Sequence, residues 1–312
     1  MTVSPSDVDA AAERIRDHVH RTPVCTSASL DQRAGAHVFL KCENLQRVGA
    51  FKFRGATNAV LSLDDASAAR GVACHSSGNH AQALALAARD RGIAAHVVMP
   101  RTAPGVKRRA VESYGATIID CEPTLPAREA ALAEVVQATG AVEIHPYDDD
   151  RVIAGQGTAC LELLEEITGL DSVVAPVGGG GLVSGTALAV AGHSSRTQVF
   201  AAEPAGADDA FRSFASGSLV PLVDHETIAD GLVTSLSRRT FALIRAHVTA
   251  IVTVTDADTI AAMRFLWERT KLLIEPSAAV AVAAACTGQV PGERIGIILS
   301  GGNVDLDHLP WA

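Results

Sequence analysis

Long uncharged apolar runs, runs of basic residues and closely spaced cysteines are all missing from this sequence of 312 residues. No apolar run approaches the length of a bilayer-spanning helix, and no basic stretch followed by an apolar one opens the chain. We therefore expect neither a membrane span nor a secretory signal. The net charge is −9 and no Lys/Arg-rich run is present, which argues against a nucleic-acid or anionic-membrane partner.

The six cysteines are scattered, and no two of them form a CxxC pair. This distribution predicts reduced thiols in a cytoplasmic protein and makes a zinc site improbable. Hydrophobic residues make up 48% of the chain and charged residues 20%, which is normal for a globular protein. The length allows one large core or two smaller ones.

Short apolar segments with β propensity alternate with helical segments along most of the chain. The predicted strands are 37–41, 71–76, 95–100, 116–121, 171–177, 198–204 and 294–302. The predicted helices are 80–90, 105–115, 126–139, 181–191 and an opening helix that contains apolar residues from 8 to 19 and is capped by Ser6. This alternation predicts βαβ units, parallel sheets and an α/β protein, with lobe crossings near 60–70 and 145–155.

A lysine lies between two phenylalanines in the segment VGAFKFRGATNAV, residues 48–60. Apolar surroundings disfavour the ammonium form and lower its pKa. The neutral amine is a nucleophile that can form a Schiff base with an aldehyde cofactor. The alternative is that Phe51 and Phe53 pack inward while Lys52 extends to water, and this segment alone favours that alternative.

Four consecutive glycines, Gly178 to Gly181, separate a buried strand from a helix in APVGGGGLVSGTALAV, residues 175–190. A backbone without side chains can surround an anion, and the helix N-terminus adds a favourable dipole. The segment lacks the Gly-Lys-Ser/Thr of a P-loop and the glycine spacing of a dinucleotide fingerprint. Because glycines are entropically costly, we predict a phosphate-sized anion site rather than a flexible connector.

Polar residues follow two other predicted strands. HSSGNHAQALALAA, residues 75–88, brings Ser76, Ser77, Asn79 and His80 to the start of a helix, which would make either a carboxylate receptor or a capping turn. ILSGGN, residues 298–303, ends a strand at Ser300, where parallel sheets bind ligands, although this segment alone favours a plain turn at the end of the strand.

A fourth strand end is acidic. AAEPAGADD, residues 201–209, contains Glu203, Ala207 and Asp209, and carboxylates with a main-chain carbonyl suit Mg²⁺ or Ca²⁺, although spacing alone favours a solvated loop. The four strand ends and Lys52 together offer a Schiff-base lysine, an anion cradle and a carboxylate receptor. Pyridoxal phosphate acting on an amino acid requires all three.

In the same order along the chain, these motifs resemble those of the serine racemase and serine/threonine dehydratase family of pyridoxal phosphate enzymes, which have fold type II (tryptophan synthase β-like). The resemblance covers nearly the whole chain, including LKCENLQRVGAFKFRGATNAV, SSGNHAQALALAA, PVGGGGLVSG, AAEPAGADDAF, LLIEPSAAVAVAA and LSGGNVDL. It implies a two-domain α/β fold, each domain a mostly parallel sheet flanked by helices. Residues 69–148 would form a small domain inserted into a large cofactor-binding domain of 1–68 and 149–312.

The resemblance also implies roles for individual residues. Lys52 would carry the internal aldimine, and Phe51 would lie against the cofactor ring. Other cofactor contacts would come from the backbone amides of Gly178, Gly179, Gly180, Gly181 and Leu182, from Asn79 at the phenolic oxygen and from Ser300 at the pyridine nitrogen. The substrate carboxylate would be received by Ser76, Asn79 and His80, and a divalent cation (Mg²⁺, Ca²⁺ or Mn²⁺) by Glu203, Ala207 and Asp209.

The activity implied is α,β-elimination, converting L-serine or L-threonine to a 2-oxo acid and ammonia. Ser300 is too weak a base to keep the pyridine nitrogen protonated, so the carbanion is less stabilised and loss of a β-hydroxyl is favoured. Ser77, Tyr114 and the cation site lean toward the racemase-like subgroup, in which Ser77 would be the second acid opposite Lys52. Serine or aspartate racemase, or 3-hydroxyaspartate dehydratase, is therefore the alternative.

Two further expectations follow from the resemblance. The protein should form a homodimer. Some relatives carry an asparagine near the cofactor after a His-Pro pair, whereas this chain has Tyr147 followed by three aspartates. We therefore expect the substrate pocket to differ there.

Overall fold

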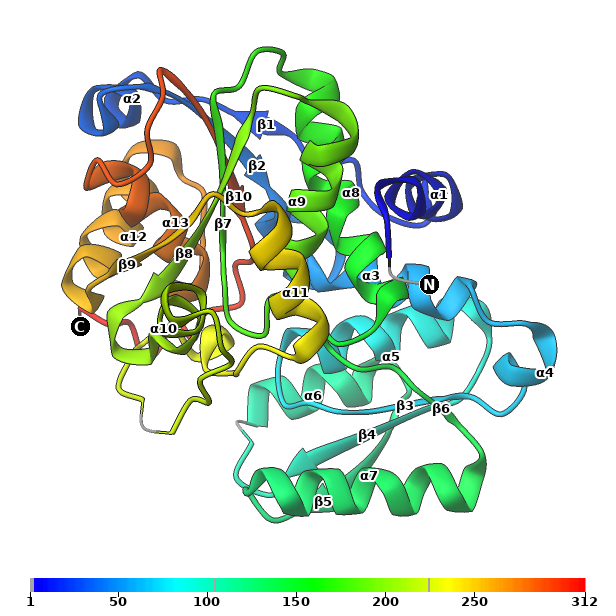
Figure 1. Ribbon diagram of the computed structural model, residues 1–312. Coiled ribbons are helices and arrows are strands. Elements are labelled where there is room, and N and C mark those ends of the chain that lie inside the picture. The colour runs from blue at the N-terminus through cyan, green and yellow to red at the C-terminus, as the bar shows by residue number, and fades with distance from the viewer. Residues whose placement is uncertain (1–2, 104, 224, 312) are drawn as a thin grey trace.

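The computed structural model describes residues 3–103, 105–223 and 225–311, and its strands form two separate sheets (Figure 1). The strands are β1 Val24–Cys25, β2 His37–Cys42, β3 Val72–His75, β4 Ala95–Pro100, β5 Thr117–Cys121, β6 Val142–Glu143, β7 Ser172–Pro176, β8 Gln198–Pro204, β9 Ala250–Val254 and β10 Arg294–Leu299. The helices are α1 Pro5–Ile15, α2 Ala28–Ala34, α3 Lys52–Leu61, α4 Asp65–Ala68, α5 Asn79–Arg91, α6 Gly105–Ser113, α7 Leu125–Thr139, α8 Asp150–Glu166, α9 Gly181–His193, α10 Asp209–Ser216, α11 Arg238–His247, α12 Asp256–Thr270 and α13 Pro276–Cys286. Within these described ranges, no helix combines the length and the apolar character needed to cross a bilayer.

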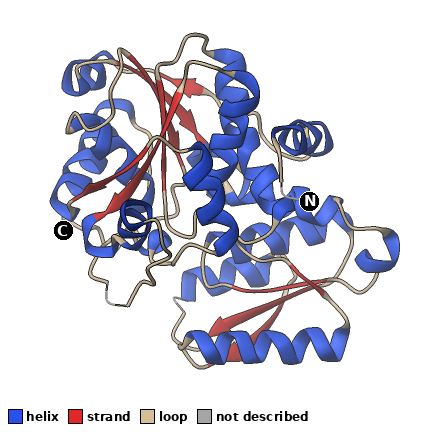
Figure 2. Cartoon of the chain, in the orientation of Figure 1, coloured by secondary structure: helices blue, strands red, loops and turns tan. Residues whose placement is uncertain are grey.

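The large sheet has the strand order β1-β2-β10-β7-β8-β9, and only the β1–β2 pair is antiparallel. Helices cover both of its faces (Figure 2). One core lies between the sheet and α8, α9 and α11, and the other between the sheet and α12 and α13. β10 is buried on both faces of the sheet. Its sequence is therefore nearly continuously apolar and lacks the alternating polar residues of a half-exposed strand.

The small sheet has the order β5-β4-β3-β6 and is parallel throughout. Its cores include residues of α5 and α6 in one cluster and residues of α7 in another. All of its strands fall between Val72 and Glu143. The predicted limits of the inserted domain, 69–148, stay a proposal, with which the position of this sheet is consistent. Residues 1–2, 104, 224 and 312 of the predicted domain ranges lie outside the described residues.

The predicted α/β class with mostly parallel sheets is confirmed. The predicted cap of the first helix is wrong, because α1 begins at Pro5 and its N-cap is Ser4. The Asp7 carboxylate accepts the Ser4 backbone N–H at 2.8 Å and the Ser4 hydroxyl at 2.6 Å, which completes a capping box. Proline at the first helical position has no N–H to satisfy, so the helix begins earlier than the apolar spacing alone indicated.

Helix α3 connects the two halves of the molecule, because it packs against α5 beside the small sheet and against α8 beside the large one. The segment before α3 is joined to the end of β10 by the bridge between Ala50 and Gly301 and by the hydrogen bond from the Phe51 N–H to the Ser300 carbonyl, 2.9 Å. Residues distant in sequence therefore meet at the start of α3.

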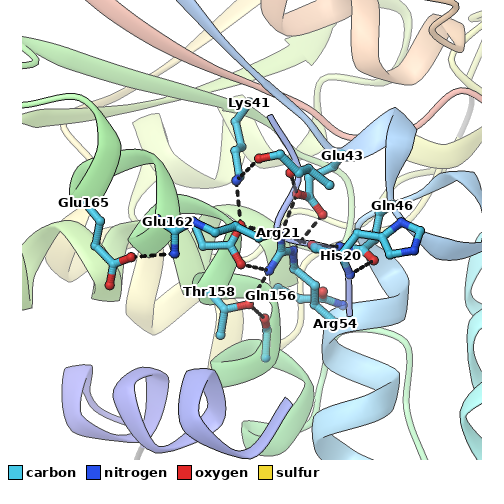
Figure 3. A network of polar contacts seen from close by, with 12 residues as sticks. His20, Arg21, Lys41, Glu43, Gln46, Arg54, Gln156, Thr158, Glu162 and Glu165 are labelled. Atoms are coloured by element: carbon cyan, nitrogen blue, oxygen red, sulfur yellow. Dashed lines mark hydrogen bonds and ion pairs between the residues drawn. The ribbon is translucent and has the colours of Figure 1, made fainter. Parts of the chain in front are cut away.

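A buried ion-pair network, here called the Arg54 network, holds α3 from its other side (Figure 3). The Arg54 guanidinium binds both carboxylate oxygens of Glu43 at 2.7 and 2.9 Å and both of Glu162 at 2.7 and 2.8 Å. Lys41 donates to the same Glu162 at 2.6 Å, and Thr158 accepts from Arg54 at 3.2 Å. Arg54, Lys41 and Glu43 are fully buried, so these charges are stable only as a paired set.

Candidate active site

Lys52 is the first residue of α3, and its amine lies in the junction between the two sheets. The amine donates to the Pro146 carbonyl at 2.8 Å and lies 5.1 Å from the centroid of the Phe51 ring. Desolvation lowers the pKa of Lys52 to about 8, against a smaller opposing effect of the Glu275 carboxylate. An appreciable fraction of the amine is therefore neutral near pH 8, as a nucleophile or general base requires.

The four glycines form a buried turn that leads from β7 into the first residue of α9, here called the glycine turn (residues 178–181). Gly180 has φ of 87°, a conformation that favours glycine. No side chain caps the N-terminus of α9, so the amide groups at its start are available to an anion. This is the cradle predicted for the phosphate, and Leu182 lies in the first turn of the same helix.

The predicted carboxylate receptor is the turn from β3 to α5. Ser76, Ser77 and Asn79 are partly buried there, and the Ser76 hydroxyl accepts the Gly78 N–H at 3.3 Å. Asn79 and His80 are the first two residues of α5, and no side chain caps this helix. The free amides of its first turn suit a carboxylate.

The His80 ring contributes differently from its neighbours. It is buried, and Nε2 donates to the Ile144 carbonyl at 2.9 Å, which fixes the tautomer. Burial, with a smaller effect of the Lys52 charge, lowers the pKa of His80 to about 3. The neutral ring therefore presents Nδ1 as an acceptor, and any carboxylate at this position must bind the main-chain N–H instead.

Sequence reasoning gave no role to Glu275 and Asn303, although both lie in motifs that it quoted. Asn79 Nδ2 donates to Glu275 Oε1 at 2.9 Å, and Asn303 Nδ2 donates to Asn79 Oδ1 at 2.8 Å. Burial raises the pKa of Glu275 to about 7. A buried glutamate at a helix N-cap, in a motif shared with a known family, is the signal that could have identified this residue.

Ser300 directly follows β10 and is buried. Its carbonyl accepts the Phe51 N–H at 2.9 Å, so Ser300 and Phe51 are adjacent, as two residues contacting one cofactor ring would have to be. The carboxyl end of this central parallel strand is also where ligands bind in open α/β sheets.

The three residues predicted to bind a divalent cation lie between the end of β8 and the start of α10. Glu203 is the penultimate residue of β8 and accepts the N–H groups of Ala210 and Phe211 at 2.9 and 2.8 Å. Ala207 and Asp209 are buried, and within the described residues neither Asp209 carboxylate oxygen has a hydrogen-bond partner. Burial raises the pKa of Glu203 to about 8 and that of Asp209 to about 6.

These surroundings fit a hard cation, because no ion pair within the described ranges neutralises either of the two buried carboxylates. The set is small: across the described ranges no group of three or more His, Cys, Asp and Glu side chains is placed to hold a metal. The Ala207 carbonyl and water would have to complete the coordination.

Tyr147 lies against the glycine turn. A Cβ atom built on Gly179 would lie 2.3 Å from Cδ1 of Tyr147, and one built on Gly181 would lie 2.9 Å from Cβ of Tyr147. The departure noted in the sequence thus borders the predicted phosphate site.

Comparison with known proteins places the chain in a class. Residues 15–301 match the family model described as pyridoxal-phosphate dependent enzyme. This chain belongs to that family.

The similar proteins include enzymes described as racemases and as dehydratases. A β-hydroxyaspartate dehydratase from Paracoccus denitrificans is 51% identical over 98% of both chains. The structure of maize serine racemase has a TM-score of 0.97 at 44% identity, covering 98% of this chain and 95% of that one. The crystal structure of a threonine deaminase from T.th. has a TM-score of 0.92 at 42% identity, covering 97% and 99%. The fold predicted from the motifs is confirmed by these structures.

Proposed function

We propose that the protein is a pyridoxal phosphate-dependent ammonia-lyase that removes water from a β-hydroxy-α-amino acid and yields a 2-oxo acid and ammonia. The observation that carries this proposal is the Lys52 amine, with its lowered pKa, in the junction with the glycine turn and the carboxylate receptor. The β-hydroxyaspartate dehydratase relative supports 3-hydroxyaspartate as substrate. L-serine and L-threonine, favoured by the sequence analysis, are the other members of the class.

The residues present fit the cofactor. The glycine turn and Leu182 would hold its phosphate through backbone amides, Phe51 would lie against its ring, and Asn79 and Ser300 would contact its two polar ring positions. When bound, the cofactor supplies an aldehyde for the amines and a ring that withdraws electrons from the substrate Cα.

The chain's own residues then perform the proton transfers. The neutral Lys52 amine removes the proton from Cα as general base. The α5 N-terminus and Ser76 hold the substrate carboxylate, which orients the Cα–H bond toward the amine. Glu275 and Asn303 hold the Asn79 amide in one orientation, because they bind its donor and its acceptor respectively. Ser300 offers a hydroxyl and not a carboxylate to the ring nitrogen, so the negative charge on Cα would be less stabilised. This favours departure of the β-hydroxyl over reactions that need a long-lived carbanion.

Racemisation is the second candidate function. Serine racemases are among the relatives, and Ser77 lies in the turn that would face the substrate. A hydroxyl on the face opposite Lys52 would return a proton to Cα and invert it. Elimination and racemisation share the step in which Cα loses its proton, so one site can perform both.

We further propose that Glu203, Ala207 and Asp209 bind a divalent cation. The support is that both carboxylates are buried and that, within the described residues, the carboxylate oxygens of Asp209 accept no hydrogen bond. The homodimer and the cytoplasmic location stay predictions from the sequence.

A substrate panel tests the proposed function. Holoenzyme is incubated with L-serine, L-threonine and 3-hydroxyaspartate, and 2-oxo acid and D-amino acid are both measured. We expect 2-oxo acid and ammonia in equal amounts, with the highest kcat/KM on 3-hydroxyaspartate. Formation of D-amino acid without 2-oxo acid would instead support the racemase. A cofactor absorbance that survives borohydride treatment, or that persists in Lys52→Ala, would contradict both functions.

A further inference from the structure

The segment His145–Pro146–Tyr147, here called the 145–147 segment, spans the site from the lysine to the glycine turn. The Pro146 carbonyl accepts the Lys52 amine at 2.8 Å at one end. The Tyr147 ring lies on Gly179 at the other, where an added Cβ would come within 2.3 to 2.5 Å of three ring carbons. One short segment therefore contacts both the amine and the predicted phosphate cradle.

The backbone of this segment is held firmly. His145 Nδ1 accepts the N–H groups of Tyr147 at 3.3 Å and Asp148 at 2.8 Å. Desolvation lowers the pKa of His145 to about 4, so the ring stays neutral and keeps this acceptor at physiological pH. The Asp148 carboxylate accepts from Ser237 at 2.9 Å and Arg239 at 2.8 Å, which ties the end of the segment to α11.

The Tyr147 ring packs against two neighbours. The His145 and Tyr147 rings form a T-shaped pair with centroids 4.6 Å apart, and the Tyr147 ring also lies against Gly179 of the glycine turn. The ring thus occupies the volume that a side chain at residue 179 would need. Gly179 is required here by this packing, independently of what its amide binds.

We propose that Tyr147 is a positioning residue that seats the glycine turn, so that its amides converge on the cofactor's phosphate at a set distance from Lys52. The inference rests on the proposed binding of that phosphate by the turn. The ring carbons perform the role, and the hydroxyl is dispensable.

Pairs of variants test the proposal by titrating cofactor-free, full-length protein with pyridoxal phosphate. Gly179→Ala should weaken binding at least about tenfold, because the new methyl meets the ring. Adding Tyr147→Ala should restore affinity to within about threefold of Tyr147→Ala alone. Tyr147→Phe keeps the ring, so it should bind like wild type and should not rescue Gly179→Ala.

Gly178→Ala is the matched control in the same turn. Its Cβ would meet the Leu232 backbone at 2.8 Å, so Tyr147→Ala should not rescue it. Pyridoxal, which lacks the phosphate, should bind wild type and Gly179→Ala within about twofold of each other. If Gly179→Ala fails to fold by circular dichroism, the double variant with Tyr147→Ala is expected to fold.

The proposal is overturned if Gly179→Ala binds pyridoxal phosphate like wild type, or if Tyr147→Ala fails to rescue it. Equal rescue of Gly178→Ala, or an equal loss of pyridoxal affinity, also overturns it, because the effect would then not be specific to the ring and the phosphate. Failure of wild-type protein to bind pyridoxal phosphate at all would instead refute the proposed function.

Discussion

Asn79, at the start of the helix that follows β3, donates its side-chain amide to Glu275, the N-cap of α13, at 2.9 Å. This bond joins an element beside the small sheet to one beside the large sheet. Because Glu275 is buried, its protonation state should affect both the stability of the protein and the orientation of Asn79.

Replacing Glu275 should change how stability depends on pH. The pKa of Glu275 in the folded protein is raised to about 7 from an ordinary 4.5, so the folded state binds this proton more tightly than the unfolded state does. The resulting stabilisation is complete below about pH 4.5 and is lost as the pH rises through about 7. Urea unfolding of cofactor-free protein at pH 5 and pH 7.5 should show a smaller loss of stability in Glu275→Gln than in wild type. Equal losses would show that this carboxyl does not titrate as described.

The Lys52 amine should react with aldehydes at unusually low pH. Because its pKa is lowered to about 8, the rate of pyridoxal phosphate incorporation into cofactor-free protein should rise with pH through a midpoint near that value. Borohydride trapping at timed intervals, with mass spectrometry of the labelled peptide, measures this rate, and Lys52→Arg is the unreactive control. A rate that keeps rising tenfold per pH unit up to pH 10 would mean that the amine has an ordinary pKa.

Ser77→Ala should separate the two candidate activities. Loss of the hydroxyl leaves Lys52 and the carboxylate receptor intact, so 2-oxo acid formation from L-serine should persist within about tenfold, whereas D-serine formation should be abolished. Chiral chromatography and a coupled 2-oxo acid assay on the same samples give both rates. Undiminished D-serine output from the variant would remove Ser77 from the mechanism.

Removing the proposed cation should lower the stability of the protein, and this effect should require the Asp209 carboxylate. Chelation by EDTA should reduce the melting temperature of the wild type, and added Mg²⁺ or Ca²⁺ should restore it. Asp209→Asn should respond to neither treatment, because it lacks one of the two carboxylates. Indifference of the wild type to EDTA would dismiss Glu203, Ala207 and Asp209 as ligands.

Breaking the Arg54 network should cost far more than breaking a surface pair. Arg54→Lys cannot bind two carboxylates through paired hydrogen bonds, and the loss should be about 3–5 kcal/mol of unfolding free energy. The control is Arg264→Ala, which removes an exposed 3.0 Å pair with Glu268 and should cost less than about 1 kcal/mol. Similar denaturant midpoints for the two variants would show that the buried set contributes little.

The sequence predicted the parts of this structure that depend on local patterns. The strands 95–100 and 198–204 match β4 and β8, because a buried parallel strand is a short apolar run with clear ends. The glycine turn was recognisable because four glycines between a strand and a helix have few structural explanations. The motif order then indicated the fold type.

Contacts between distant segments could not be predicted in this way. Nothing near Glu275 in sequence shows that Asn79 will meet it, since this bond joins positions 196 residues apart. The same is true of Pro146 and Lys52, whose contact arises only when the 145–147 segment reaches the start of α3. The tautomer of His80 could not be predicted either, because it depends on the carbonyl of Ile144, which is distant in sequence.

The position of β10 in the large sheet bears on how the protein is made. This strand inserts between β2 and β7, yet it is translated after both, and residues 300–301 join the lysine segment only once it is in place. Until β10 is synthesised, β2 and β7 each have one edge whose backbone N–H and C=O groups are unpaired. Such edges promote aggregation. The proposed site is therefore complete only after this last strand has been translated and has entered the sheet.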